Sequence, residues 1–81
     1  VRLSLESPVN NIESTISSFN SQFQLNKPEK EAVGWALPLE YGFTMFNVVN
    51  TYTKAAQYRD LPAESSHRLQ KVGGMIMAMV N

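Results

Sequence analysis

Apolar side chains recur every three or four positions along most of this sequence, and this spacing constrains the fold more than any other feature. Two series show it most clearly, one near each end: Ile12, Ile16, Phe19, Phe23, and Leu69, Val72, Ile76, Met79. A helix has 3.6 residues per turn, so each series lies on one helical face that must be buried against a neighbour. The spacing therefore predicts an all-α fold of three or four helices, packed as an orthogonal or up-down bundle.

Helix start and stop signals divide the first half of the chain into two helices. Asn10 and Glu13 have the spacing of a capping box, and Pro8 is an alternative first residue for the same helix. Pro28 suits the first turn of a second, short helix. That helix is expected to end before Pro38, because the residue preceding a proline disfavours the helical region.

The second half of the chain has the strongest helical pattern. Phe43 to Arg59 has a broad apolar face, with Thr51 expected on the opposite, polar side. Asp60 is then predicted to cap a final helix of about 61–80. Alternation in 75–80 also permits a strand, but the helical series that begins upstream favours a helix.

Residues 1–7 alternate between apolar and polar side chains, which predicts either a short N-terminal strand or an unstructured tail. The expected core combines the apolar faces of all the helices. Its predicted members are Ile12, Ile16, Phe19, Phe23, Val33, Trp35, Leu37, Met45, Val49, Tyr52, Ala56, Leu69, Val72, Ile76 and Met79.

Size and composition limit the classes of function. The chain has 81 residues, no cysteine, and seven basic residues balanced by seven acidic ones. One small helical domain over 1–81 is expected, without thiolate chemistry or a net positive charge that attracts nucleic acid. With no signal peptide and no apolar run long enough to cross a bilayer, we expect a cytoplasmic protein that does not bind membranes. The chain begins at Val1, so either an initiator methionine was removed or this is a fragment or short relative of a longer protein.

The residues that carry catalysis or bind metals are scarce. His67 is the single histidine and falls on the polar side of the last predicted helix, where it is expected to be solvated. No zinc-binding, calcium-binding or phosphate-loop motif is present, and no lysine follows the Gly73-Gly74 pair in the phosphate-loop pattern. We therefore expect no catalytic, cofactor-binding or metal-binding residues, and no enzyme.

One segment resembles a known family. The match covers about residues 42–75, and it rests on Thr44, Phe46, Asn50 and Thr53. These positions are similar to a helix near the C-terminus of the phage/plasmid-like proteins of domain of unknown function 932. The chain departs from that pattern at Thr51, where the family tends to have alanine. The resemblance implies a phage, plasmid or other mobile-element source, and it implies no activity.

A non-enzymatic assembly or interaction module is the function that these features favour. Methionine adapts to irregular contacts and glycine permits close approach, so the last helix suits packing against a second copy or another protein. The candidate interaction residues are Asn50, Thr53, Gly73, Gly74, Met75 and Met77. The alternative is an accessory domain of a phage DNA-metabolism protein that contacts single-stranded DNA, suggested by the resemblance and by Tyr41 and Tyr58.

Overall fold

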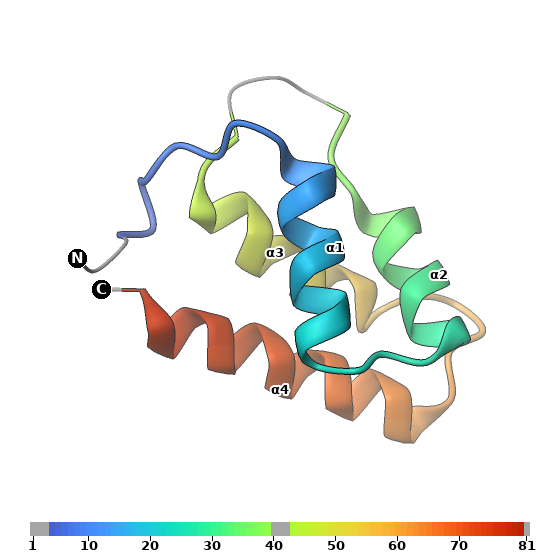
Figure 1. Ribbon diagram of the computed structural model, residues 1–81. Coiled ribbons are helices and arrows are strands. Elements are labelled where there is room, and N and C mark those ends of the chain that lie inside the picture. The colour runs from blue at the N-terminus through green and yellow to red at the C-terminus, as the bar shows by residue number, and fades with distance from the viewer. Residues whose placement is uncertain (1–3, 40–42, 81) are drawn as a thin grey trace.

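The computed structural model describes residues 4–39 and 43–80, which form four helices and no strand (Figure 1). The helices are α1 (Ile12–Gln22), α2 (Lys27–Ala36), α3 (Met45–Ala55) and α4 (Ala63–Met79). α3 is central: it packs along α4, which runs in the opposite direction, and against α2, while α1 lies over α3. The predicted all-α bundle is confirmed.

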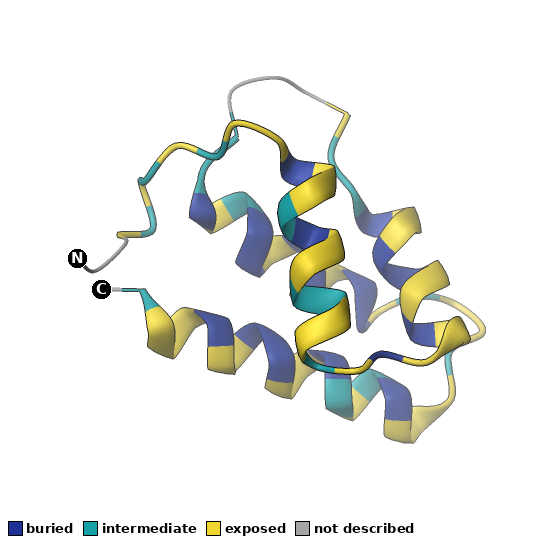
Figure 2. Cartoon of the chain, in the orientation of Figure 1, coloured by how far each residue is buried: buried dark blue, intermediate teal, exposed yellow. Residues whose placement is uncertain are grey.

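The core lies where α3 meets the other helices (Figure 2). Most predicted core positions are buried, and Phe19, Phe23 and Leu37 are partly buried against them. The core also takes in residues missing from the predicted set: Leu25, Ala32, Ala36, Val48 and Ala55.

Two core predictions were wrong: Trp35 and Met79 are each 51% exposed. The Trp35 ring lies against the ring of Tyr58, with centroids 5.3 Å apart, and the Lys54 amine sits 5.2 Å from its centre. The indole therefore packs on the surface, where an aromatic face attracts a cation. Met79 belongs to the final turn of α4. Its position fits the apolar series, but the last buried residue of that series is Ile76.

Three helix starts differ from the predictions. Asn11, not Asn10, caps α1, because its side-chain oxygen accepts a hydrogen bond from the Ser14 amide at 2.9 Å. α3 begins at Met45, two residues later than predicted, and ends at Ala55. α4 begins after Pro62 without a side-chain cap, so the predicted capping role of Asp60 was wrong.

The turn between α1 and α2 is set by backbone bonds and a capping box. Gln24 has a positive φ of 55°, and the Leu25 amide donates to the Asn20 carbonyl, as in a Schellman motif. Asn26 then caps α2, and its own amide donates to the Glu29 carboxylate at 3.0 Å. Both bonds of the capping box are present, which places the Glu29 side chain in the protein interior.

The N-terminal segment is neither a regular strand nor a separate tail over the residues described. Pro8 forms an isolated antiparallel bridge with Thr44. The carbonyls of Ser7 and Leu5 accept hydrogen bonds from the Met45 and Phe46 amides at 3.0 and 2.8 Å. Helix N-terminal amides lack partners inside their own helix, so this segment satisfies the start of α3. Residues 1–3 of the predicted strand lie outside the described residues.

Thr51 was predicted on the polar face of its helix, but it is only 1% exposed. Its hydroxyl donates to the Asn47 carbonyl one turn earlier, at 2.7 Å. This bond satisfies the hydroxyl within the helix, so the threonine can be buried without an unpaired polar group.

Candidate protein-interaction site

The two helices that carry the predicted interaction residues are in contact at Gly73. A methyl group placed there would lie 3.4 Å from Oγ1 of Thr53 and 3.7 Å from the Val49 carbonyl oxygen. At Gly74, the same addition meets nothing within 4 Å among the described atoms. Only the first glycine of the pair therefore serves the close approach of α4 to α3, and α4 runs through both glycines without interruption.

The difference between the two glycines yields a testable pair of variants. We expect Gly74→Ala to raise the free energy of unfolding by about 1 kcal/mol, because alanine favours a helix interior over glycine. Gly73→Leu should lower it by about 2 kcal/mol, because its side chain must displace α3. Urea unfolding followed by circular dichroism measures both. A Gly74→Leu variant as stable as wild type is the matched control, and equal losses at the two positions would contradict the packing.

The α3–α4 contact has an outer edge, which we call the outer seam: Phe46, Asn50, Thr53, Gly73 and Met77. Gly73 is buried there, and the other four residues are exposed. The Thr53 hydroxyl donates to the Val49 carbonyl of its own helix at 3.1 Å. Asn50 is exposed, and the structure gives its side chain no hydrogen bond to another described residue. Met77 follows Gly73 by one turn, and the two helices are antiparallel, so Met77 lies toward the start of α3, which is the end that carries Phe46. Phe46 and Met77 are 55% and 43% exposed.

Met75 lies on a different side of α4 from Met77, because two helical residues separated by one other point in nearly opposite directions. It shares its side with Arg68, Lys71 and Val72, facing the end of α1 at Phe23. The six predicted interaction residues therefore do not form one surface. Asn50, Thr53, Gly73 and Met77 belong to the outer seam, and Gly74 lies beside it. Met75 lines a hollow on the opposite side of α4.

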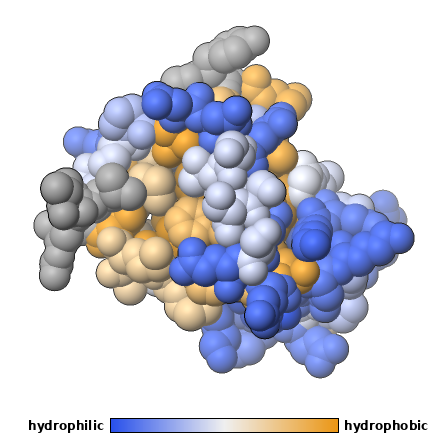
Figure 3. All heavy atoms as spheres, in the orientation of Figure 1, coloured by the Kyte–Doolittle hydropathy of each residue, from blue (hydrophilic) through white to orange (hydrophobic). Residues whose placement is uncertain are grey.

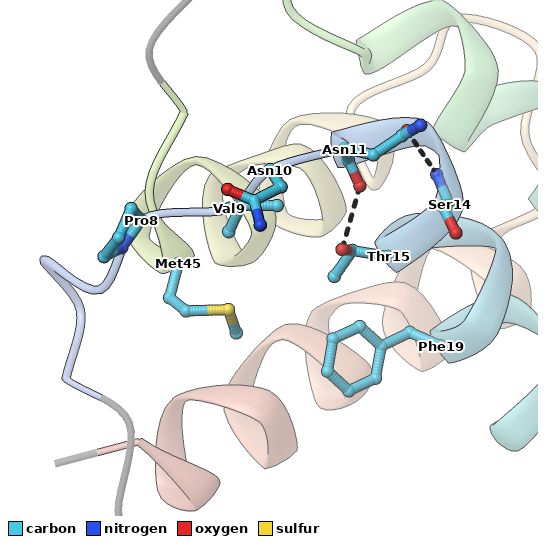
Figure 4. A pocket seen from close by; sticks show the side chains of 8 residues that line it. All are labelled: Pro8, Val9, Asn10, Asn11, Ser14, Thr15, Phe19 and Met45. Atoms are coloured by element: carbon cyan, nitrogen blue, oxygen red, sulfur yellow. Dashed lines mark hydrogen bonds between the residues drawn. The ribbon is translucent and has the colours of Figure 1, made fainter.

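A second apolar surface lies beside α1, which packs on α3 and has few contacts with α4. It has two separate hollows: the first lies between α1, the N-terminal segment and the start of α3, and the second lies between the end of α1 and α4. In the first hollow, Phe19 of α1 and Met45 of α3 point toward one another beside the N-terminal segment (Figure 4). In the second hollow, Phe23 faces Val72 and Met75 of α4. Figure 3 shows apolar atoms gathered beside α1, over the C-terminal half of α4.

Two cationic side chains, Arg68 and Lys71, line the second hollow beside His67. Among the described residues, no acidic side chain lines either hollow. Arg68 is held in place: its guanidinium donates to the buried Glu29 carboxylate at 3.1 Å and to the carbonyls of Phe23 and Gln24. This arginine connects α4 to the turn between α1 and α2, and these bonds fix the position of its guanidinium beside the second hollow.

Sequence reasoning missed these hollows and the Glu29–Arg68 pair beside the second one. The Asn26–Glu29 spacing of a capping box was a readable signal for the position of Glu29. Nothing local in the sequence connects it with Arg68, which is 39 positions away. The second hollow depends on how far the end of α1 stands from α4. Periodicity within one helix carries no information about that distance.

Groups that would support catalysis or metal binding are few in the described ranges. His67 is exposed, and no three His, Asp or Glu side chains converge on a metal position there. No helix in those ranges is both long and apolar enough to cross a bilayer.

The fold and its surfaces define a small all-α domain with two exposed apolar faces on its last helix. No protein-family model, curated protein or solved structure matches the chain. The resemblance to the phage/plasmid-like family thus stays a prediction from residues 42–75.

Proposed function

We propose that this chain is a cytoplasmic, non-enzymatic helical module that assembles with a second copy of itself through the outer seam. The observation that supports the proposal is the pair of large apolar side chains, Phe46 and Met77, exposed on either side of the close α3–α4 contact. Small domains gain stability by burying such side chains in an oligomer, because one small core leaves little net stability.

The chemistry of the seam suits a two-fold contact. Gly73 adds no side chain, and Asn50 and Thr53 are short, so this part of the seam carries little bulk. The large apolar side chains of Phe46 and Met77 lie toward the end of the seam at the start of α3. In a two-fold dimer the same patch meets itself, and Phe46 of one copy can lie against Met77 of the other. Asn50 then offers an amide whose donor and acceptor groups can pair across the axis.

A mobile-element source is part of the proposal only through the resemblance of residues 42–75. The alternative role in binding single-stranded DNA has no specific observation in its favour. Tyr58, one of the two tyrosines that suggested it, packs against Trp35, and Tyr41 lies outside the described residues.

Light scattering from low to high micromolar protein tests the proposal. We expect the weight-average mass to rise to that of a dimer with concentration. Phe46→Gln combined with Met77→Gln should keep the protein monomeric, because the apolar gain on association is lost. Met75→Gln is the matched control on the other side of α4, and it should still form dimers. A wild-type protein that stays monomeric at high micromolar concentration overturns the proposal.

A further inference from the structure

We propose that Met77 is an oxidation switch for self-association: a peroxide converts its thioether to the sulfoxide, and the sulfoxide separates the two copies that the outer seam joins. This inference rests on the proposed function and adds to it a modification that regulates the same seam. Three features of the chain point to Met77: its set of oxidisable side chains, the exposure of its methionines, and the position of Met77 in the seam.

Methionine is the side chain of this protein that a peroxide oxidises most readily. The sequence has four methionines and no cysteine, so no thiolate competes for the peroxide. A lone pair of the thioether sulfur attacks one peroxide oxygen. The S–O bond forms as the O–O bond breaks, and with hydrogen peroxide the second oxygen leaves as water. Sulfur is oxidised by two electrons while the peroxide is reduced, and the product is a polar, chiral sulfoxide.

Exposure divides the four methionines into two groups. Met45 is 4% exposed and belongs to the core, whereas Met75, Met77 and Met79 of α4 are 44%, 43% and 51% exposed. A peroxide in solution therefore reaches the three methionines of α4 before it reaches Met45. Met75 and Met77 are almost equally exposed on the same helix, so we expect a single copy of the chain to be oxidised at both positions at similar rates.

Of the three exposed methionines, Met77 alone lies in the outer seam. It is one turn from Gly73, at the end of the seam that carries Phe46, while Met75 and Met79 lie on the other side of α4. In a two-fold dimer, Met77 of one copy packs against Phe46 of the other, and thioether sulfur makes favourable contacts with an aromatic ring.

Oxidation changes that contact from favourable to unfavourable. The sulfoxide oxygen must give up its hydrogen bonds to water to enter the apolar contact, and burying a polar group in this way disfavours the dimer. A two-fold dimer holds the contact twice, so both copies contribute to the loss. Oxidation of Met75 or Met79 leaves the seam unchanged, which makes these residues internal controls.

The first test compares the oxidation of Met75 and Met77 at different protein concentrations. Hydrogen peroxide is added to the full chain at low and at high micromolar protein, and tandem mass spectrometry locates each added oxygen atom. We expect similar rates for the two residues in the dilute protein. In the concentrated protein Met77 should be oxidised at least about threefold more slowly than Met75, because the dimer covers it.

The second test measures association after oxidation. The peroxide dose is chosen to modify the methionines of α4 and to leave Met45 unmodified. Light scattering should then show dissociation of the wild-type dimer, with a dissociation constant at least about tenfold higher. Treatment with the two methionine sulfoxide reductases and a dithiol should restore the dimer, because the dithiol becomes a disulfide while the sulfoxide oxygen leaves as water.

Two conservative variants assign the effect to one residue. Met77→Leu keeps an apolar side chain of similar size without the sulfur, so it should form dimers before and after peroxide treatment. Met75→Leu is the matched control, and its dimer should dissociate on oxidation as the wild-type dimer does. Unchanged circular dichroism of the oxidised proteins shows that the fold is intact.

Two results would overturn the inference while the proposed function stands: an oxidised wild-type protein that remains dimeric, and a Met77→Leu dimer that dissociates on oxidation as readily as wild type. Oxidation of Met45 as fast as Met77 would contradict the difference in burial on which the switch depends. A wild-type chain that is monomeric before any peroxide is added overturns the proposed function and the switch together, so the untreated sample distinguishes the two failures.

Discussion

Replacing Arg68 with methionine is expected to lower the free energy of unfolding by about 2.5 kcal/mol. Glu29 is 2% exposed, and Arg68 is the cation that faces its carboxylate. Methionine keeps much of the apolar length of the arginine stem, so the loss comes from a buried negative charge without a counter-ion. Removing one member of a fully buried pair costs more, but the Arg68 side chain is 42% exposed and water weakens the interaction.

The same replacement also removes donors from the turn between α1 and α2. Arg68 donates to the carbonyl of Phe23 and to the carbonyl of Gln24, the residue with positive φ. Without these bonds the turn and α4 are joined mainly by apolar contacts. For a domain of this size, the expected loss corresponds to a melting temperature about 10 to 20 °C lower.

A second change should reverse most of that loss. In the Glu29→Gln, Arg68→Met double variant, glutamine can still accept the Asn26 amide, as in a capping box, and it needs no counter-ion. We expect the double variant to lie within about 1 kcal/mol of wild type in urea unfolding. Lys30→Met, at an exposed position on the same helix, should change stability by less than about 0.5 kcal/mol. A loss below about 1 kcal/mol for Arg68→Met alone would show that the ion pair is not important for the fold.

The features of the fold that could be predicted are those that depend on local sequence patterns. The series from Ile12 to Phe23 and from Leu69 to Ile76 placed α1 and α4, because a buried face must repeat with the period of the helix. The proline at position 38 marked the end of α2 for a steric reason that operates within two residues. Such signals need no knowledge of the rest of the molecule.

The errors arose where tertiary contacts outweigh local preference. Trp35 is a large apolar residue, yet its neighbours Lys54 and Tyr58 stabilise it at the surface. Thr51 is polar, yet its bond to Asn47 allows it to be buried. Of the predicted interaction residues, Gly73 and Gly74 are adjacent in the sequence, yet only Gly73 lies against α3. That difference is a property of the packed structure.

Tyr52 should make the protein lose stability at alkaline pH. Its side chain is 0% exposed, and its hydroxyl donates to the Ile16 carbonyl at 3.1 Å and to the Asn20 side-chain oxygen at 2.7 Å. Burial raises the pKa of Tyr52 well above its ordinary value of 10.0, because the phenolate would be formed away from water. In the unfolded chain this tyrosine ionises with its ordinary pKa.

The sign of the effect follows from these two states. Below pH 10 both the folded and the unfolded chain keep the Tyr52 proton, so the stabilising contribution of the buried phenol to the free energy of unfolding is fully present. As pH rises above 10, the unfolded chain loses the proton while the folded chain retains it, which stabilises the unfolded state. The free energy of unfolding should then fall by up to about 1.4 kcal/mol per pH unit, or about 2.7 kcal/mol two units above the unfolded pKa.

Tyr52→Phe isolates this contribution from the other alkaline groups. At neutral pH the variant should be about 1 kcal/mol less stable than wild type, because it lacks the two hydroxyl bonds that join α3 to α1. Above pH 10 it lacks the ionisation of Tyr52, so its urea midpoint should fall less steeply and overtake that of wild type. Tyr58→Phe, at a partly exposed position, is the control and should keep the wild-type slope. Parallel alkaline profiles for wild type and Tyr52→Phe would mean that the phenol ionises as readily in the folded chain as in the unfolded one, and that α1 does not seal it from water.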